Sequence, residues 1–405
     1  MKSYNNLWEK LISDENIILA ERTAGKGKNK NNRRHKNLRK FRANPENYVE
    51  YFKEFAKNYN SKGVITKTII DGSNGKQRII TIPTPQDVVL QNMVVNVLKP
   101  ILVNGMYEHS YACIDGRGTI QAVKAIKKIM DKEENDYVNP KYANYSRKKK
   151  KKSKVSNCFK ADISKFFNSV SQEDLIKRLR KIIRDKKFME LLEKIIKSIL
   201  QGLALGYATS HWLANWLLTP MDHYIKEILK VPYYFRFVDD IVLFDSSKRR
   251  LHSYRIAIEN YLQENYNLPL KDNWQVFPLS SYSVKTTKDV EYKKEHSLSV
   301  KTKEGRFLDF LGYKFHRKSL LHNNKTNRIT IRKSNIIRIK HKANHINKKE
   351  KANVFDARQM ITYIGMCKYS NSFTWFTNNV LNKITIKRLK KKISDFDKQH
   401  QLKIA

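Results

Sequence analysis

The stretch that decides the fold is YYFRFVDDIVLF, residues 233–244. Aromatic and β-branched residues flank two adjacent aspartates, Asp239 and Asp240, so the pattern predicts two strands that meet at a tight turn. Burying two carboxylates in such an apolar hairpin is costly unless a cation or a hydrogen-bond donor meets them. Taken alone, the pair fits either an acidic turn exposed to water or a metal site.

The composition indicates a folded protein with a polyanionic partner. The 405 residues carry 81 Lys and Arg against 38 Asp and Glu, a formal net charge of +43, and 40% are hydrophobic. A chain of this length can bury a sizeable core and is expected to form two or three lobes. Because neutralised phosphates supply much of nucleic-acid affinity, RNA or DNA is the expected partner. A basic protein without such a partner would carry the same charge.

The sequence favours the cytoplasm. Cys113, Cys158 and Cys367 lie far apart and form neither a CxxC metal pair nor an obvious disulfide set. Residues 1–23 carry charges of both signs and lack the apolar core of a signal peptide. No long apolar run or lipidation signal accompanies the basic charge, so no membrane partner is expected.

The region after an N-terminal helical segment predicts a β-hairpin and a helix. Residues 64–70 and 77–83 alternate as strands do, and a DGSNG turn joins them. Asp87 is expected to open a helix that Pro100 ends. Lys76 and Arg78 lie just past the hairpin tip, where they either hold a triphosphate or face water.

Three further positions are candidates for contact with nucleic acid or substrate. Arg117 is flanked by glycines before a predicted helix, and such a turn can bring an Arg close to phosphate. Gly206 and Ser210 are small residues four apart, over which a base pair or template could pack closely. The alternative for Gly206 and Ser210 is an ordinary packing helix, which Pro220 interrupts.

A further candidate metal carboxylate lies earlier in the chain. Asp162 ends an apolar strand, 77 positions before Asp239, and a helix is expected from about Ser171 to residue 200. If a sheet joins these acids, Asp162 and Asp239 can hold two Mg²⁺ ions, or Mn²⁺ in their place, with Asp240 as either a third ligand or a structural hydrogen-bond acceptor. Two such ions can activate a 3′-hydroxyl and stabilise a leaving pyrophosphate.

The remainder of the chain predicts a helix and a strand before Lys271, a strand pair around Gly312, and a basic helical tail from Ile329. In this order the motifs FKADISKFF, FVDD, LKDN and FLGY resemble those of a bacterial reverse transcriptase of the group II intron-like lineage. The resemblance implies an α+β right-hand polymerase fold. Its parts would be a basic helical extension over 1–60, fingers and palm over 61–320, and a basic helical thumb over 321–405.

The resemblance also implies roles for single residues in an RNA-directed DNA polymerase that adds dNTPs to a 3′-hydroxyl. Asp162, Asp239 and Asp240 would be the catalytic metal ligands, and Phe167 the bulky residue that rejects a ribose 2′-hydroxyl. The other substrate-binding residues would be Lys76, Arg78, Gly206 and Lys271. The residues that contact nucleic acid would be Arg117, Ser210, Gly312 and Tyr313.

Within the lineage, YACIDGRG and LGYATSHWLAN look closest to diversity-generating retroelement enzymes and defence-associated relatives. Leu205 before Gly206 is aliphatic, as in the first group, whereas His211 and FVDD depart from it. We therefore expect an antiviral defence enzyme that works with a structured non-coding RNA, with an accessory protein or a second copy of the chain as further candidate partners. The alternatives are a retroelement enzyme, untemplated or protein-primed DNA synthesis, and a non-catalytic RNA-binding scaffold.

Overall fold

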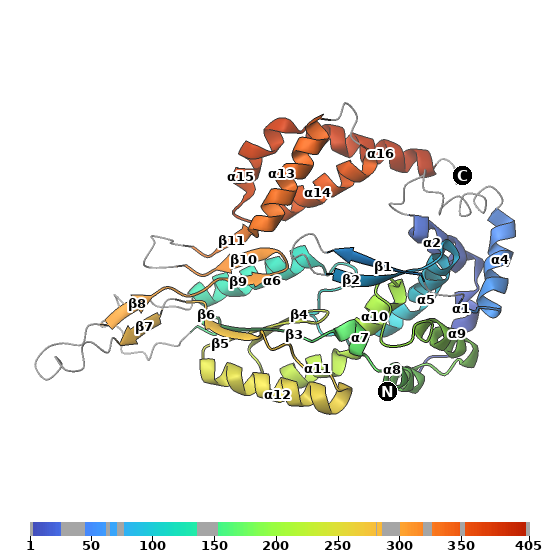
Figure 1. Cartoon of the computed structure of the whole chain (residues 1–405), viewed down its shortest axis with the longest axis horizontal. Helices are drawn as coiled ribbons and strands as arrows, with labels where there is room; N and C mark the ends of the chain where they lie inside the picture. Colours follow the sequence, from blue (N-terminus) through green and yellow to red (C-terminus); the bar gives the residue numbers. More distant parts are fainter. Residues whose placement is uncertain are drawn as a thin grey trace, which may run out of the picture.

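A four-stranded antiparallel sheet lies at the centre of the computed structural model (Figure 1). The structure describes residues 3–25, 45–61, 65–70, 77–135, 153–280, 282–285, 300–318, 326–348 and 353–401. The strand order is β4-β5-β3-β6. The bounds are β3 (Asn157–Asp162), β4 (Tyr233–Phe237), β5 (Asp240–Asp245) and β6 (Gln275–Pro278). The mixture of helices and antiparallel sheets confirms the expected α+β class.

Side chains of the central sheet alternate between two apolar cores, one on each face. Phe159 and Ile241 belong to the first core, while Cys158 and Val242 belong to the second. The helices that contribute to the first core are α1 (Leu7–Leu11), α2 (Asp14–Gly25), α4 (Pro45–Lys57), α5 (Pro85–Val103), α7 (Phe166–Ser169), α8 (Gln172–Ile182), α9 (Lys186–Ile196), α10 (Ala208–Leu217), α11 (Thr219–His223), the π-helix η3 (Tyr224–Ile228) and α12 (Lys248–Tyr266).

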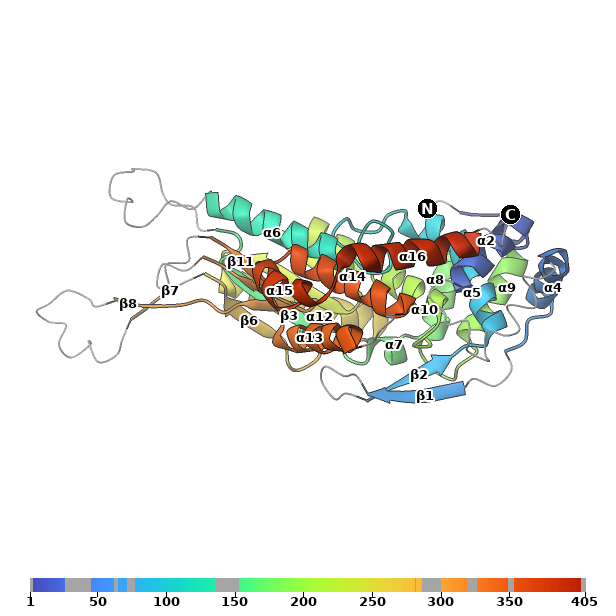
Figure 2. The same cartoon turned by 90° about the horizontal axis from the view of Figure 1, so that it is seen from above.

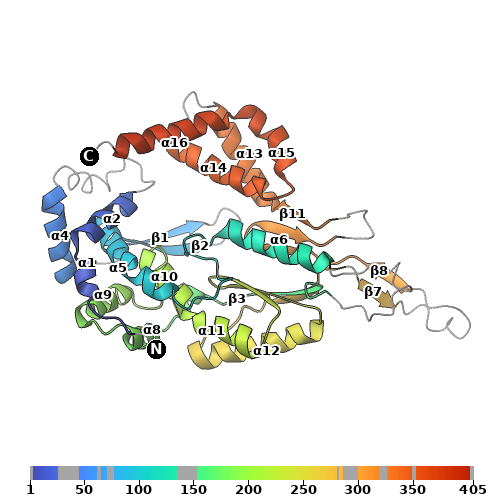
Figure 3. The same cartoon turned by 180° about the vertical axis from the view of Figure 1, so that it is seen from behind.

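The second core joins the sheet to the C-terminal part of the chain. Its elements are α6 (Thr119–Asn135), β9 (Leu308–Phe310), β10 (Tyr313–His316), β11 (Arg328–Ile331), α13 (Lys333–Lys348), α14 (Val354–Lys368), α15 (Phe373–Asn379), η6 (Leu381–Lys383) and α16 (Ile386–Gln401). From above, the C-terminal helices lie over the central sheet (Figure 2). From behind, α6 runs between those helices and α12 (Figure 3).

Two antiparallel hairpins flank the centre. The predicted N-terminal hairpin is present as β1 (Ile65–Ile70) and β2 (Gln77–Ile82), with Ile70 opposite Gln77. The second hairpin consists of β7 (Tyr282–Lys285) and β8 (Val300–Lys303). Among the described helices, none is long and apolar enough to cross a membrane. The predicted domain boundaries at residues 60 and 320 stay predictions.

Tertiary packing overrides three local predictions. Helix α5 continues through Pro100, because it packs along α2 and α10, and Asp87 is not its first residue but part of a capping box with Thr84. The helix predicted up to residue 200 breaks in two, and Asp185 caps the second half by accepting from the Phe188 amide at 3.1 Å.

Two further corrections concern strands. The segment before Lys271 forms only a single β-bridge, between Ile163 and Leu270, rather than a strand. The tail predicted to be helical from Ile329 begins instead with β11, which pairs with β10. Leu270 obtains its partner from a distant part of the chain and β11 pairs with the strand before it, and local periodicity indicates neither pairing.

A fully buried ion pair stabilises the sheet next to the acidic turn. Arg236 and Asp222 are both inaccessible to solvent. The Arg236 Nε and Nη2 atoms donate to the two Asp222 carboxylate oxygens at 2.7 and 2.5 Å. The Tyr234 hydroxyl donates to the same carboxylate at 2.6 Å. This carboxylate therefore links β4 to α11.

Replacing Asp222 by Asn should destabilise the protein by about 3–5 kcal/mol, because the Arg236 charge would stay buried without a counterion. Urea denaturation followed by circular dichroism measures this loss. The matched control is Glu190→Gln on the exposed face of α9, which should change the free energy of unfolding by less than about 0.5 kcal/mol. Equal losses in both variants would contradict the assignment.

Candidate active site

The three predicted carboxylates meet at one end of the central sheet. Asp162, the last residue of β3, lies directly opposite Asp240, the first residue of β5. Asp239 occupies the two-residue turn between β4 and β5, and its carbonyl accepts from the Ile163 amide at 3.2 Å. The sheet thus brings together acids that are far apart in sequence. It places Asp240, rather than Asp239, directly across from Asp162.

The electrostatics of the three acids are those of carboxylates forced together. Burial, a hydrogen bond to Asp162 and the neighbouring negative charges raise the pKa of Asp240 to about 8. Burial also acts to raise the pKa of Asp162, but the hydrogen bond from Asp240 and the ion pair with Lys271 outweigh it and lower that pKa. At neutral pH the pair therefore shares a proton, with Asp162 ionised.

Three cations act on this cluster, and one of them, Lys160, opposes the rise in the pKa of Asp240 and helps to lower the pKa of Asp162. The Lys271 ammonium lies 2.9 Å from the Asp162 carboxylate, and the Lys271 amide donates to the Asp162 carbonyl at 2.8 Å. Burial raises the pKa of Asp239, while the positive charges of Lys271 and Arg78 oppose that shift. The Arg78 side chain on β2 is therefore close enough to act on the cluster. Lys76 lies outside the described residues.

The donor set fits a hard divalent cation. Asp162, Asp239 and Asp240 supply carboxylate oxygens, the ligands that Mg²⁺ prefers, and the proton that two of them share is what a metal ion would replace. Within the described ranges, no group of three or more Asp, Glu, His or Cys residues is already arranged around a common metal position. The side chains must therefore turn to ligate an ion together, and their assignment as ligands stays a prediction.

Phe167 follows Asp162 by five residues, on the short helix α7, and a neighbouring loop contacts its backbone. The Leu203 amide donates to the Phe167 carbonyl at 2.6 Å. A Cβ on Gly202 would lie 2.4 Å from that carbonyl oxygen, so only glycine allows this approach. The Gln172 amide nitrogen holds the loop by donating to the Gly202 carbonyl at 2.9 Å. The His211 ring meets the Phe167 ring edge-on at 5.4 Å.

Gly206 brings the same loop against the β1–β2 hairpin. The Thr81 amide donates to the Leu205 carbonyl at 2.7 Å, and a Cβ on Gly206 would lie 2.2 Å from the Thr81 carbonyl oxygen. Its φ of +117° also disfavours any side chain. The glycine is thus explained by contact with protein backbone rather than by an open surface. Its role at a substrate stays a prediction.

The residues predicted to contact nucleic acid have different surroundings. The half-buried Arg117 guanidinium donates to the Tyr107 carbonyl at 2.9 Å. Ser210 is 3% exposed and Tyr313 is fully buried, so both side chains pack against other protein groups. Gly312, with a φ of +83°, lies against Asn335 and Met366. A role of these residues at nucleic acid stays a prediction.

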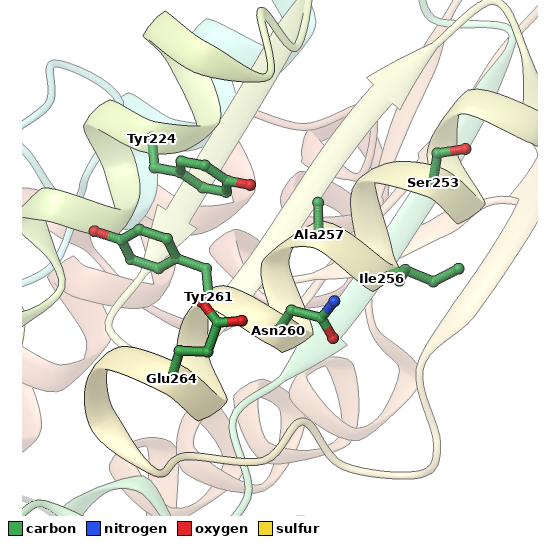
Figure 4. A pocket seen from close by; sticks show the side chains of 7 residues that line it. All are labelled: Tyr224, Ser253, Ile256, Ala257, Asn260, Tyr261 and Glu264. Carbon is green, nitrogen blue, oxygen red and sulfur yellow. The ribbon is translucent and has the colours of Figure 1, made fainter.

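A shallow pocket on α12 is not part of this site. Tyr224 of η3 stacks on Tyr261 of α12, with ring centroids 4.4 Å apart (Figure 4). The lining residues are Tyr224, Ser253, Ile256, Ala257, Asn260, Tyr261 and Glu264. None of them belongs to the predicted site.

The sequence analysis missed the polar network behind the acidic turn. Arg236 bonds with Asp222 and with Asn215, and the Asn215 amide nitrogen donates to the Ala112 carbonyl at 2.9 Å. One signal was available, because Arg236 stands alone among aromatic residues of a strand in YYFRF. A charged residue in such a strand requires a buried counterion.

Comparison with known proteins was made by family, by sequence and by structure. Residues 65–315 match the family model described as reverse transcriptase (RNA-dependent DNA polymerase). The chain is 25% identical to Protein YkfC of Escherichia coli (strain K12) over 227 residues, covering 53% of this chain and 50% of that protein. The chain thus spans about half the length of this curated relative.

Among solved structures, the chain is similar to telomerase from Candida albicans in complex with the TWJ fragment of telomeric RNA. The TM-score is 0.45 and the sequence identity is 12%. The similarity covers 91% of this chain and 65% of the telomerase chain.

The pKa of Asp240 leads to a prediction for the metal-free protein. The folded-state pKa of about 8 exceeds the unfolded value of about 3.9, so the native state binds an extra proton between these pH values. The stabilisation from this proton is complete below the unfolded pKa and is lost as pH rises through the folded pKa. Asp240→Asn cannot titrate, so its free energy of unfolding should increase relative to wild type between pH 5 and about 8.

Urea denaturation in EDTA at several pH values measures this difference. The exposed Asp395→Asn provides the control, because its difference from wild type should show no such rise. A difference between Asp240→Asn and wild type that stays constant with pH would contradict the assigned shift.

Proposed function

The chain belongs to the reverse transcriptase family and has the right-hand polymerase fold of that family, and we propose that Asp162, Asp239 and Asp240 are its catalytic residues. Membership supports RNA-directed DNA polymerase activity in general. The observation that supports the proposal for these residues is that Asp162 and Asp240 face each other across β3 and β5, with Asp239 in the adjoining turn. All three lie inside the region that matches the family.

The remaining site residues have separate tasks in this proposal. Mg²⁺ ions held by the three aspartates would activate a primer 3′-hydroxyl and stabilise the leaving pyrophosphate. Lys271 keeps Asp162 ionised and in place, through its ammonium and its backbone amide. Arg78 adds positive charge on the hairpin side, where the triphosphate of an incoming dNTP would lie. Phe167 would exclude a ribose 2′-hydroxyl.

The biological setting is a further part of the proposal. We infer a bacterial antiviral defence role with a structured non-coding RNA, because LGYATSHWLAN and YACIDGRG resemble that branch of the family and the net charge is +43. All three cysteines are free thiols, which agrees with a cytoplasmic site of action. Sequencing the RNA that copurifies and the DNA product, together with phage plating, tests this role. Random product sequence and unchanged plating would contradict it.

Primer extension on an RNA template with dNTPs and Mg²⁺ tests the catalytic assignment. Asp239→Ala/Asp240→Ala should abolish extension while RNA binding persists, because phosphate contacts supply most of that affinity. Asp395→Ala on the exposed face of α16 is the matched control and should extend normally. Equal DNA synthesis by wild type and the double variant would contradict the proposal. Tight RNA binding without extension by wild type would favour a non-catalytic scaffold.

Phe167→Ala should raise ribonucleotide incorporation relative to deoxyribonucleotide by about tenfold or more, because the ring that opposes the 2′-hydroxyl is removed. Single-nucleotide incorporation with each dNTP and its matching rNTP gives the two kcat/KM values. Phe355→Ala, an exposed aromatic truncation on α14, should leave their ratio unchanged. An unchanged ratio in Phe167→Ala would remove the role assigned to this ring.

A further inference from the structure

Arg236 makes every hydrogen bond that a guanidinium can donate, although it is completely buried. Besides its bonds to Asp222, its Nη1 donates to the Asn215 side-chain oxygen at 2.8 Å and to the Val238 carbonyl at 3.1 Å. Its Nη2 also donates to the Asn215 carbonyl at 3.1 Å. Burial opposes the charge, but Asp222 outweighs it and raises the pKa of Arg236. The side chain is therefore a charged and geometrically fixed donor.

The Val238 carbonyl that Arg236 binds belongs to a strained turn. Val238 has a φ of +57°. Several non-glycine residues in the described part of the chain have a positive φ, and Val238 is the one among them with a β-branched side chain. This conformation is unfavourable for a β-branched side chain and persists only where surrounding contacts enforce it. Within the described residues, the side-chain hydrogen bond that reaches this carbonyl comes from Arg236.

The next residue along is Asp239, and both peptide groups that flank it are fixed. The preceding carbonyl, that of Val238, accepts from Arg236, and the Asp239 carbonyl accepts from the Ile163 amide. Because a residue has only two soft backbone dihedrals, fixing both flanking peptide planes fixes the direction of its Cα–Cβ bond. Arg236 thereby determines the direction in which the Asp239 side chain leaves the backbone, relative to Asp162 and Asp240.

We propose that Arg236 is a positioning residue for the catalytic carboxylates, acting through its hydrogen bond to the Val238 carbonyl. This inference rests on the proposed function, because it takes the three aspartates as the metal-binding site. Arg236 is fully buried and is bonded to protein groups on all sides, so its effect reaches the site through the backbone of the turn. Removal of a residue that orients metal ligands without touching the metal typically lowers metal affinity or activity by about 10–100-fold.

The test compares two variants that disturb the same buried network. Arg236→Lys keeps a positive charge beside Asp222 but cannot reproduce the planar fork that also reaches Val238. Tyr234→Phe removes the hydroxyl that donates to Asp222 and leaves the Val238 contact intact. At equal folded fraction, Arg236→Lys should weaken Mn²⁺ binding and lower kcat, each by about tenfold or more. Tyr234→Phe should change neither by more than about twofold.

The measurements are Mn²⁺ titration of the protein by electron paramagnetic resonance, steady-state kinetics, and RNA affinity by fluorescence anisotropy. A purely structural role predicts that both variants lose activity in proportion to their unfolded fraction. The positioning role predicts unchanged RNA affinity and dNTP KM, with the loss confined to kcat and Mn²⁺ affinity. Equal Mn²⁺ affinity and kcat in Arg236→Lys and Tyr234→Phe would overturn the inference.

Val238→Gly adds an independent check, because glycine adopts positive φ without strain. If Arg236 acts by holding this conformation, the loss of Mn²⁺ affinity and kcat caused by Arg236→Lys should be several-fold smaller in the Val238→Gly background than in wild type. If the effects of Arg236→Lys and Val238→Gly on Mn²⁺ affinity and kcat are additive, the inference is contradicted. If Arg236→Lys does not fold, Arg236→Met/Asp222→Leu replaces it, since that variant leaves no unpaired charge from this ion pair.

The two proposals fail in different ways. Wild-type protein that binds Mn²⁺ but does not extend primers would refute the proposed activity, and Mn²⁺ affinities alone would then decide the role of Arg236. Active wild type with a fully active Arg236→Lys variant would refute only the positioning role. Wild type that neither binds Mn²⁺ nor extends primers would refute both, because no site would exist to be positioned.

Discussion

The pairing of β3 with β5 is the constraint on which the active site depends. It sets Asp162 opposite Asp240 and forces two carboxylates into hydrogen-bonding distance in a partly buried place. Such a contact is unfavourable unless a proton, a cation or both are present. The Lys271 ammonium offsets the negative charge of Asp162, and the shared proton removes the negative charge of the second carboxyl group, Asp240. In the proposed function, a metal ion would take the place of this proton.

Sequence reasoning succeeded where local chemistry determines the structure. The turn at Asp239, the strand that ends at Asp162 and the helix cap at Ser171 all follow from residue type and alternation over a few positions. It failed where distant packing decides the outcome, as in the passage of α5 through Pro100. The charge of Arg236 in an aromatic strand indicated a buried counterion, but it did not identify Asp222 and Asn215, which come from other segments of the chain.

The loop around Gly202 and Gly206 shows how tightly the parts of the site are joined. One end of this loop touches the Phe167 backbone and the other touches Thr81 on the hairpin that carries Arg78. Both approaches are too close for any residue except glycine. The ring proposed to select the sugar and the strand proposed to meet the triphosphate are thus held by a single stretch of backbone.

The position of β3 between β5 and β6 has a consequence for the synthesis of the protein. The apolar residues of β3 leave the ribosome well before either neighbouring strand, so Phe159 has no sheet partner until Leu243 of β5 has been made, and no second one until Val276 of β6 follows. Non-local pairing of this kind is slow, and unpaired apolar strands favour aggregation. The N-terminal helices can pack earlier. The emergence of β6, long after Asp162 has been made, therefore sets the moment at which the central sheet can be completed.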